Sequence, residues 1–138
     1  MANEKIGTVV TEGMGGYTWY KNSRLNRLTA WNNDQVIDVP SEIIYLEDLD
    51  NNKVWSLAVN PAPDDNDYYI IYGFGYSKYY HISNGIEQSA TVFIPEKDSA
   101  KINLIKLSNK LAKKKKIRLI YYIKPVLGED EIKSNEYM

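Results

Sequence analysis

Asn84 and Gly85 lie between two stretches of alternating apolar and polar residues, Ser77–Ser83 and Ile86–Ile94. Both residues tolerate the positive φ angles of a tight two-residue turn, and in this setting they form the strongest short-range signal for a β-hairpin. The pattern predicts two antiparallel strands joined at residues 84–85. A chain with this feature is restricted to folds that contain antiparallel sheet.

Turn residues separate apolar segments at two further places. Ile43–Asp48 and Lys53–Leu57 flank Leu49-Asp-Asn-Asn52, which predicts a second hairpin with a longer loop. Ile102–Ser108 and Lys116–Ile123 flank a lysine-rich connection, which predicts a third hairpin. Strand pairing between neighbouring segments therefore accounts for much of the chain.

The remaining signals also favour strands and loops. Tyr68–Tyr72 precedes Gly73-Phe-Gly75, whose glycines predict a bend or bulge between two short strands. Two prolines and a cluster of Asp and Asn residues predict a loop at Asn60–Asn66. Asp98–Ala112 fits one face of a helix as well as a bulged strand, and we predict a strand there.

These elements predict an all-β fold, an antiparallel β-sandwich of roughly eight to ten short strands. The 138 residues are enough for one domain with its own core, so we expect a single β-sandwich domain over residues 1–138. Residues 128–138 turn polar and lose the alternating pattern, and we expect them to form either a frayed tail or the start of a further segment.

Charge and composition exclude several classes of protein. The formal net charge of −1 gives no overall attraction to nucleic acid or to an acidic membrane. The sequence has no apolar signal core at its N-terminus and no apolar run long enough to span a bilayer. It contains no cysteine, which excludes disulfides and is compatible with a reducing compartment. We therefore expect a cytoplasmic protein with neither a membrane nor a nucleic acid as partner.

The sequence offers little catalytic chemistry. A glycosidase needs two acids on opposite sides of the scissile bond, but acids in turns of a β-protein are more often solvated. With His81 as the only histidine, neither a zinc site nor a catalytic triad can be assembled convincingly. We predict no catalytic residue, no metal ligand and no cofactor. The candidate acids for such a pair are Asp34, Asp38, Glu42, Glu47 and Asp48.

An unusual block between residues 13 and 34 combines three glycines, two tryptophans and two arginines. Tyr17, Trp19 and Trp31 offer flat rings on which sugars stack, and Arg24 and Asp34 can hydrogen-bond to hydroxyl groups. These five residues are the predicted carbohydrate-binding or interdomain-binding site. The alternative is an entry loop bent at its glycines, whose tryptophans fill the core.

A series of short motifs follows in order along nearly the whole chain: Gly15-Gly-Tyr-Thr-Trp19, Asn22-Ser-Arg24, Arg27-Leu-Thr29, Trp31, Asn33-Asp34, Tyr45-Leu-Glu-Asp48, Val54-Trp-Ser56, Gly73-Phe-Gly-Tyr76, Asn84-Gly85, Val92-Phe-Ile-Pro95, Lys101-Ile102, Tyr121-Tyr122 and Leu127-Gly128. Together they resemble the amino-terminal domain of glycoside hydrolase family 94, formerly glycosyltransferase family 36. That family contains the inverting cellobiose and chitobiose phosphorylases and the cyclic β-1,2-glucan synthases of the NdvB type.

The resemblance implies a galactose-mutarotase-like supersandwich, of which this chain would be the first half. It also implies that catalysis belongs to a separate (α/α)6 barrel, so the chain would be a non-catalytic module. Its partner would be a β-linked gluco-oligosaccharide or that barrel, and a homo-oligomer is expected. Half a sandwich exposes apolar faces or unpaired edge strands, which predicts either a smaller closed sandwich or self-association.

Two other functions stay open. One is a structural or assembly fragment without a ligand, which burial of all three indoles would favour. The other is a small sugar epimerase of the mutarotase type, which needs a base and an acid at the anomeric centre. The epimerase hypothesis depends on His81.

Overall fold

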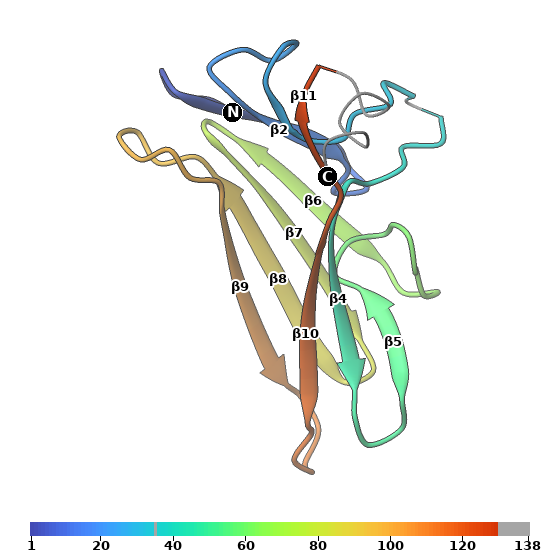
Figure 1. Ribbon diagram of the computed structural model, residues 1–138. Coiled ribbons are helices and arrows are strands. Elements are labelled where there is room, and N and C mark those ends of the chain that lie inside the picture. The colour runs from blue at the N-terminus through green and yellow to red at the C-terminus, as the bar shows by residue number, and fades with distance from the viewer. Residues whose placement is uncertain (35, 130–138) are drawn as a thin grey trace.

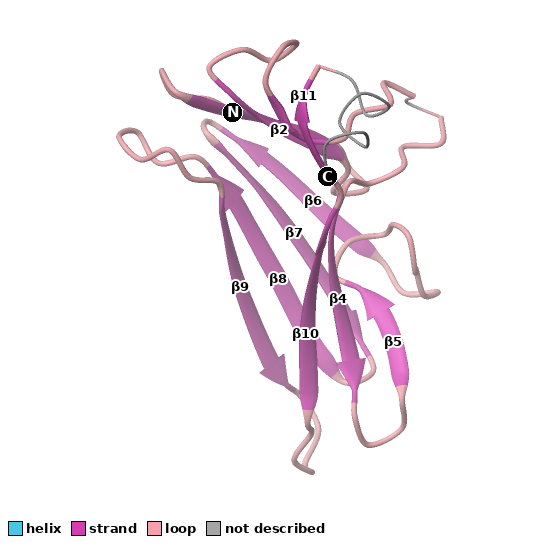
Figure 2. Ribbon diagram, in the orientation of Figure 1, coloured by secondary structure: helices cyan, strands magenta, loops and turns pink. Residues whose placement is uncertain are grey.

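The computed structural model describes residues 1–34 and 36–129, which form strands and loops and no helix (Figures 1 and 2). The eleven strands are β1 (Ile6–Val10), β2 (Gly16–Tyr20), β3 (Arg27–Thr29), β4 (Glu42–Asp48), β5 (Lys53–Ser56), β6 (Tyr68–Gly73), β7 (Tyr76–Ser83), β8 (Ile86–Phe93), β9 (Ile102–Asn109), β10 (Ile117–Ile123) and β11 (Pro125–Gly128). The all-β prediction is confirmed.

The strands form three antiparallel sheets. The order is β6-β7-β8-β9 in one sheet, β10-β4-β5 in the second and β1-β2-β3-β11 in the third. The first two sheets face each other as a sandwich, and the third lies across one end of it, at the top of Figure 1. The antiparallel sandwich is therefore confirmed, with an additional sheet that caps one end.

Two of the predicted hairpins form as expected. In the β7–β8 hairpin Ser83 lies opposite Ile86, and both Asn84 and Gly85 have positive φ angles, of 52° and 77°. In the β4–β5 hairpin Asp48 lies opposite Lys53. Local turn chemistry was sufficient to predict these pairings because each strand pairs with its nearest neighbour in sequence.

The third predicted hairpin is wrong. Both strands exist, but β9 pairs with β8 and β10 pairs with β4, so the connection between them crosses from one sheet to the other. Lys115, in this connection, forms an ion pair with the buried Asp48 at the end of β4. Alternation predicts which face a strand buries, but it does not predict which neighbour the strand takes.

Two smaller expectations have mixed outcomes. Of the bend or bulge predicted at Gly73-Phe-Gly75, the bend is found: Gly73 pairs directly with Tyr76 across a tight turn between β6 and β7, and their register has no bulge. Gly75 has a φ of +79°, as such a turn requires. Gly128 is the last residue of β11 and not part of a tail. Residues 130–138 of the predicted tail lie outside the described residues.

Apolar side chains from the two facing sheets fill the core between β4, β5, β7 and β8. Its fully buried members include Leu46, Trp55, Leu57, Tyr79, Ile86, Ala90 and Val92. The indole Nε1 of Trp55 donates to Oε1 of the buried Gln88 at 2.8 Å, and Gln88 Nε2 donates to the carbonyl of Leu57 at 3.0 Å. One amide side chain thus satisfies two polar groups of the segment at the end of β5 inside the core.

Glu42 connects the capping sheet to the sandwich. Its Oε1 accepts hydrogen bonds from Thr18 at 2.6 Å and Thr29 at 3.0 Å, both in the capping sheet. Its Oε2 accepts from Lys101 Nζ at 2.8 Å and from the hydroxyl of Tyr121 at 2.7 Å. Both oxygens of this buried carboxylate are therefore fully engaged, by residues from several different segments of the chain.

Burial tends to raise the pKa of Glu42, but the charge of Lys101 and the hydrogen bonds from Lys101, Thr18 and Tyr121 outweigh it and lower the pKa below its usual value of 4.5. The folded state therefore binds fewer protons at this site than the unfolded chain does. The resulting stabilisation is complete above the unfolded pKa and is lost as the pH falls through the lowered folded pKa.

We therefore expect the free energy of unfolding to decline as the pH falls below about 5 and through the lowered pKa of Glu42. The decline should be smaller in Glu42→Gln, which cannot titrate at this position. Urea unfolding at a series of pH values checks this expectation. An equally steep decline in Glu42→Gln and in the wild type would show that other carboxylates cause it.

Candidate functional site

Three aromatic residues of the predicted site gather on one face of the capping sheet. In β2, Tyr17 and Trp19 alternate with Thr18, so their rings lie on the face opposite the Glu42 network. The ring centroids of Tyr17 and Trp19 are 5.1 Å apart. Trp31, which follows β3, stacks on Tyr17 at 5.1 Å with an interplanar angle of 29°.

Two residues outside the prediction hold this cluster in place. Arg27 lies opposite Trp19 in the β2–β3 pair, and its guanidinium lies 5.5 Å from the centroid of the Tyr17 ring. Gly7 lies opposite Trp19 in the β1–β2 pair, and a Cβ at Gly7 would come within 2.2 Å of the indole. The rings therefore pack on one another and on the sheet, and Trp19 and Trp31 stay half-buried.

Trp31 also lines a pocket of about 370 Å³. The wall contains three carboxylates, one amide, a threonine and two valines. The lining residues are Thr11, Glu12, Gly13, Trp31, Asp34, Val36, Asp38, Val59 and Asn60. An indole beside carboxylate and amide groups offers both an apolar surface and hydrogen-bond partners to one ligand.

Local hydrogen bonds position the acids of the pocket. Asp34 Oδ1 accepts from the backbone N–H groups of Val36 at 2.9 Å and Ile37 at 3.0 Å, which closes a short turn. Thr11 donates its hydroxyl proton to Asp38 Oδ2 at 2.6 Å. Each carboxylate keeps further lone pairs, because a carboxylate can accept about four hydrogen bonds.

The glycines of the block make room for these side chains. A Cβ at Gly13 would come within 2.7 Å of Asn60 Nδ2 and 2.9 Å of Asp38 Oδ2. A Cβ at Gly15 would come within 2.5 Å of Asp38 Oδ1. The loop between β1 and β2 therefore needs residues without side chains here, so that the polar groups of the pocket can approach its backbone.

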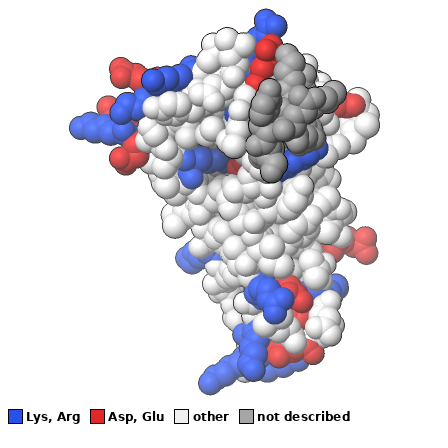
Figure 3. Space-filling model, viewed as in Figure 1, with Lys and Arg blue, Asp and Glu red and all other residues white. Residues whose placement is uncertain are grey.

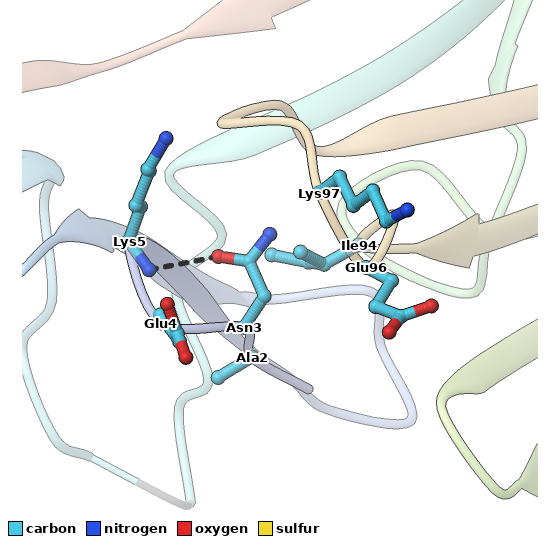
Figure 4. Close-up of a pocket in the computed structure, with 7 residues that line it drawn as sticks. All are labelled: Ala2, Asn3, Glu4, Lys5, Ile94, Glu96 and Lys97. Atoms are coloured by element: carbon cyan, nitrogen blue, oxygen red, sulfur yellow. Dashed lines mark hydrogen bonds between the residues drawn. The ribbon is translucent and has the colours of Figure 1, made fainter.

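A larger hollow, of about 600 Å³, lies between the N-terminal segment and the residues that follow β8 (Figure 4). Asn3 anchors it, since its Nδ2 donates to the carbonyl of Pro95 at 2.7 Å. The hollow has no aromatic lining, and the charged ends of Lys5, Glu96 and Lys97 point in different directions. Its polar groups do not converge on a common point, so we do not regard it as the functional site.

The structure brings together four of the five predicted site residues. Tyr17, Trp19 and Trp31 form one cluster, and Asp34 shares the pocket with Trp31. Arg24 lies in the turn between β2 and β3, with a largely exposed side chain whose Nε is 3.3 Å from Glu129 Oε1. It does not line the pocket.

Sequence reasoning missed Glu12 and Asn60 as pocket residues, and it considered Asp38 only as a possible catalytic acid. Asn60 belongs to the predicted loop between β5 and β6, which is distant in sequence from the aromatic block. The only local signal was the glycine content of residues 13–16, which indicates close backbone approach without naming the residues that approach.

The three tryptophans do not share one environment. Trp55 is 2% exposed in the core, whereas Trp19 and Trp31 are half-buried at the surface of the capping sheet. The condition that favoured a fragment without a ligand, burial of all three indoles, is not met.

His81 does not face the pocket. It is fully buried in β7, where its Nδ1 lies 2.9 Å from the carbonyl oxygen of Asp67 and its Nε2 lies 3.0 Å from Asp64 Oδ1. The ring of Tyr68 stacks on the imidazole at 3.7 Å. Both ring nitrogens thus lie within 3.0 Å of oxygen atoms of the segment between β5 and β6, although only Nδ1 has the geometry of a hydrogen bond.

Within residues 1–34 and 36–129, no group of three or more His, Asp or Glu side chains is arranged to hold a metal ion. The same part of the chain contains no helix with the length and apolarity needed to cross a bilayer.

A sequence model of the glycosyl hydrolase 94 supersandwich domain matches residues 1–137. The chain belongs to glycosyl hydrolase family 94. The N,N'-diacetylchitobiose phosphorylase of Vibrio proteolyticus is 33% identical over 105 residues, which cover 74% of this chain and 13% of that protein. The corresponding phosphorylase of Vibrio furnissii is 31% identical over 112 residues, 79% of this chain and 14% of that protein.

A further relative aligns with the full length of the chain. This is the cyclic β-(1,2)-glucan synthase NdvB of Rhizobium meliloti, which is 25% identical over 139 residues, 100% of this chain and 5% of that protein. This chain therefore spans only a small part of the length of the curated relatives that it matches. The resemblance found in the ordered motifs and the all-β supersandwich class are both confirmed.

Proposed function

We propose that this family 94 supersandwich chain is a non-catalytic carbohydrate-binding module, and that its ligand enters the pocket beside Trp31. The observation that carries the proposal is the position of Trp31. One part of its indole packs on Tyr17, and another part lines a pocket that also contains Asp34, Asp38 and Asn60.

The chemistry of this pocket suits a neutral sugar. The C–H groups on one face of a pyranose ring form an apolar surface that an indole can cover, while its hydroxyl groups both donate and accept hydrogen bonds. Carboxylates accept from hydroxyls, and an amide can both donate and accept. The acidic lining disfavours an anionic ligand, because Glu12, Asp34 and Asp38 would repel it.

The names of the relatives agree with this ligand class. Two are phosphorylases of N,N'-diacetylchitobiose and one is a synthase of cyclic β-(1,2)-glucan. We therefore propose a β-linked oligosaccharide of glucose or N-acetylglucosamine as the ligand.

A second candidate function is docking onto another domain, such as the (α/α)6 barrel that the family resemblance implies. The observation in its favour is the loop beside Asp34, where Val36 is 94% exposed and Ile37 65% exposed. Exposed aliphatic residues next to a pocket are typical of a surface that another polypeptide covers.

Replacing Trp31 by alanine is expected to weaken oligosaccharide binding at least about fivefold, because stacking of a ring on an aromatic side chain contributes on the order of 1 kcal/mol or more. Trp31→Phe should retain part of the affinity. Titration with N,N'-diacetylchitobiose and with β-1,2- and β-1,4-gluco-oligosaccharides, followed by tryptophan fluorescence or calorimetry, checks this prediction.

Arg24→Ala is the matched control, since Arg24 comes from the same block but lies outside the pocket and pairs with Glu129. Its affinity should equal that of the wild type. Saturable binding that Trp31→Ala leaves unchanged would place the sugar elsewhere. Absence of binding at millimolar sugar would favour the docking function.

A further inference from the structure

The outer face of the β6-β7-β8-β9 sheet carries a hollow of about 290 Å³, which shares no lining residue with the pocket beside Trp31. It lies toward the end of the sheet where β7 and β8 join and β9 ends, the lower end in Figure 1. Because Tyr79 and Gln88 are buried in the core, alternation turns their neighbours Tyr80 and Ser89 outward. The lining residues are Lys78, Tyr80, Glu87, Ser89, Lys106, Ser108 and Lys110.

The strand register explains why a hollow forms at this place. Ser89 pairs with Tyr80 on one side and with Lys106 on the other, so these three residues lie side by side on β7, β8 and β9. In the next outward row Glu87 lies opposite Ser108. Neighbouring residues on one face of a sheet have Cβ atoms about 5 Å apart, so short serines among longer side chains leave a depression.

The lining of the hollow is positively charged. Three lysines and one carboxylate give it a formal charge of +2. Lys110 forms an ion pair with Glu87, and its hydrogen bond and charge lower the pKa of that carboxyl below the usual 4.5. Within the part of the chain that the structure describes, neither Lys78 nor Lys106 forms an ion pair. The hollow therefore holds two ammonium groups whose charge no carboxylate of the described chain neutralises.

The two serines of the hollow have unused hydrogen-bonding capacity. Within residues 1–34 and 36–129, the hydroxyl groups of Ser89 and Ser108 form no hydrogen bond with another group of the chain. Hydroxyl and ammonium groups can all donate hydrogen bonds. Donors from β7, β8 and β9 thus surround one hollow, whereas the pocket beside Trp31 is lined by three carboxylates.

The surroundings of the hollow add positive charge. In the space-filling view, charged side chains gather toward the two ends of the molecule and leave a broad uncharged band between them (Figure 3). Lys110 begins the connection from β9 to β10, in which residues 113–116 are all lysines. Lys115 pairs with the buried Asp48, and the other three form no ion pair among the described residues. Clustered charges of one sign raise the local concentration of a ligand of the opposite sign.

We propose that this hollow binds a phosphate group, either as inorganic phosphate or as part of a phosphate monoester. A phosphate dianion matches the formal charge of +2, and its oxygen atoms accept hydrogen bonds from ammonium and hydroxyl groups. Lysine carries its charge on a flexible stem, so Lys78 and Lys106 can converge on one group above Ser89. The volume is roughly ten times the ~30 Å³ that a water molecule occupies, which leaves room for a small esterified group beside Tyr80.

An NMR titration of the ¹⁵N-labelled chain tests this proposal. Inorganic phosphate and phenyl phosphate are added in a phosphate-free buffer, with sodium chloride adjusted to keep the ionic strength constant. We expect saturable shifts of the amides of Ser89 and Ser108 at millimolar ligand. Equal affinities would identify the phosphate group alone as the ligand, and tighter binding of phenyl phosphate would assign a monoester to the hollow.

Substitutions of lysine separate a specific site from general attraction of charge. Lys106→Gln is expected to weaken phosphate binding at least about fivefold, because it removes one of the two unpaired ammonium groups. Lys106→Arg keeps the charge and should retain most of the affinity. Lys53→Gln is the matched control, since Lys53 is an exposed residue of β5, in the other sheet, and does not line the hollow. Its affinity should equal that of the wild type.

Three results would overturn the proposal. One is the absence of saturable shifts with both probes, and another is an equal loss of affinity in Lys106→Gln and Lys53→Gln. The third is tighter binding of an acidic peptide, such as oligoglutamate, than of both phosphate probes, which would assign the hollow to a polypeptide partner. Because Lys106 does not line the pocket beside Trp31, Lys106→Gln should bind oligosaccharide like the wild type, so this proposal and the proposed function can fail independently.

Discussion

Replacement of Glu42 by alanine is expected to lower the free energy of unfolding by about 3–5 kcal/mol, the usual effect of removing one member of a buried ion pair. The variant leaves the Lys101 ammonium, whose side chain is only 11% exposed, without its carboxylate. It also removes the shared acceptor of Thr18 and Thr29, which attaches the capping sheet to the sandwich. Urea unfolding followed by circular dichroism measures the change.

The matched control for this variant is Glu47→Ala. Glu47 lies on the same strand, but its partner Arg118 has a side chain that is 59% exposed. Exposed ion pairs contribute only about 0–1 kcal/mol, so the control should remain close to the wild type. Equal losses in the two variants would mean that Glu42 does not connect the sheets as described.

The second large effect is expected for Gln88→Leu, which should cost about 2–4 kcal/mol. Leucine has a similar volume, so the loss comes from polar groups that remain buried without partners. These are the indole N–H of Trp55 and the carbonyl of Leu57. Thermal and urea unfolding both report this change.

A double-mutant cycle identifies the cause. Adding Trp55→Phe removes the unpaired N–H, so the double variant should lose about 1 kcal/mol less than the sum of the two single variants. Ser89→Ala, at the next position of β8 but on its outer face, should stay within about 0.5 kcal/mol of the wild type. Strict additivity of the two single effects would contradict the proposed role of the hydrogen bond.

The fold was largely predictable from local chemistry. Asn84-Gly85 and Leu49–Asn52 each join strands that are neighbours both in sequence and in space, so turn residues and alternation were sufficient. The prediction of a hairpin between β9 and β10 was wrong because the lysines that connect them are equally suited to a hairpin loop and to a crossover between sheets. That choice depends on which strand edges remain free after the other strands have paired, which is a property of the whole fold.

The candidate site was predictable only in part. The rings of Tyr17 and Trp19 come together because alternation places them on one face of β2, and their cluster with Trp31 depends on the short chain between β2 and β3. Asn60 reaches the pocket from a loop whose path is fixed by contacts elsewhere, including the buried His81. Arg24 was a reasonable candidate by chemistry, but its position in an exposed turn directs it to Glu129.

The most direct test of the central claim is a ¹H–¹⁵N NMR titration of the labelled chain with N,N'-diacetylchitobiose and with β-1,2-gluco-oligosaccharides. A carbohydrate module that binds beside Trp31 should show saturable shifts of the Trp31 indole and of the amides of Asp34, Asp38 and Asn60, while the buried Trp55 indole stays in place. Spectra that remain unchanged at millimolar concentrations of both sugars, or shifts confined to residues outside this pocket, would contradict the account.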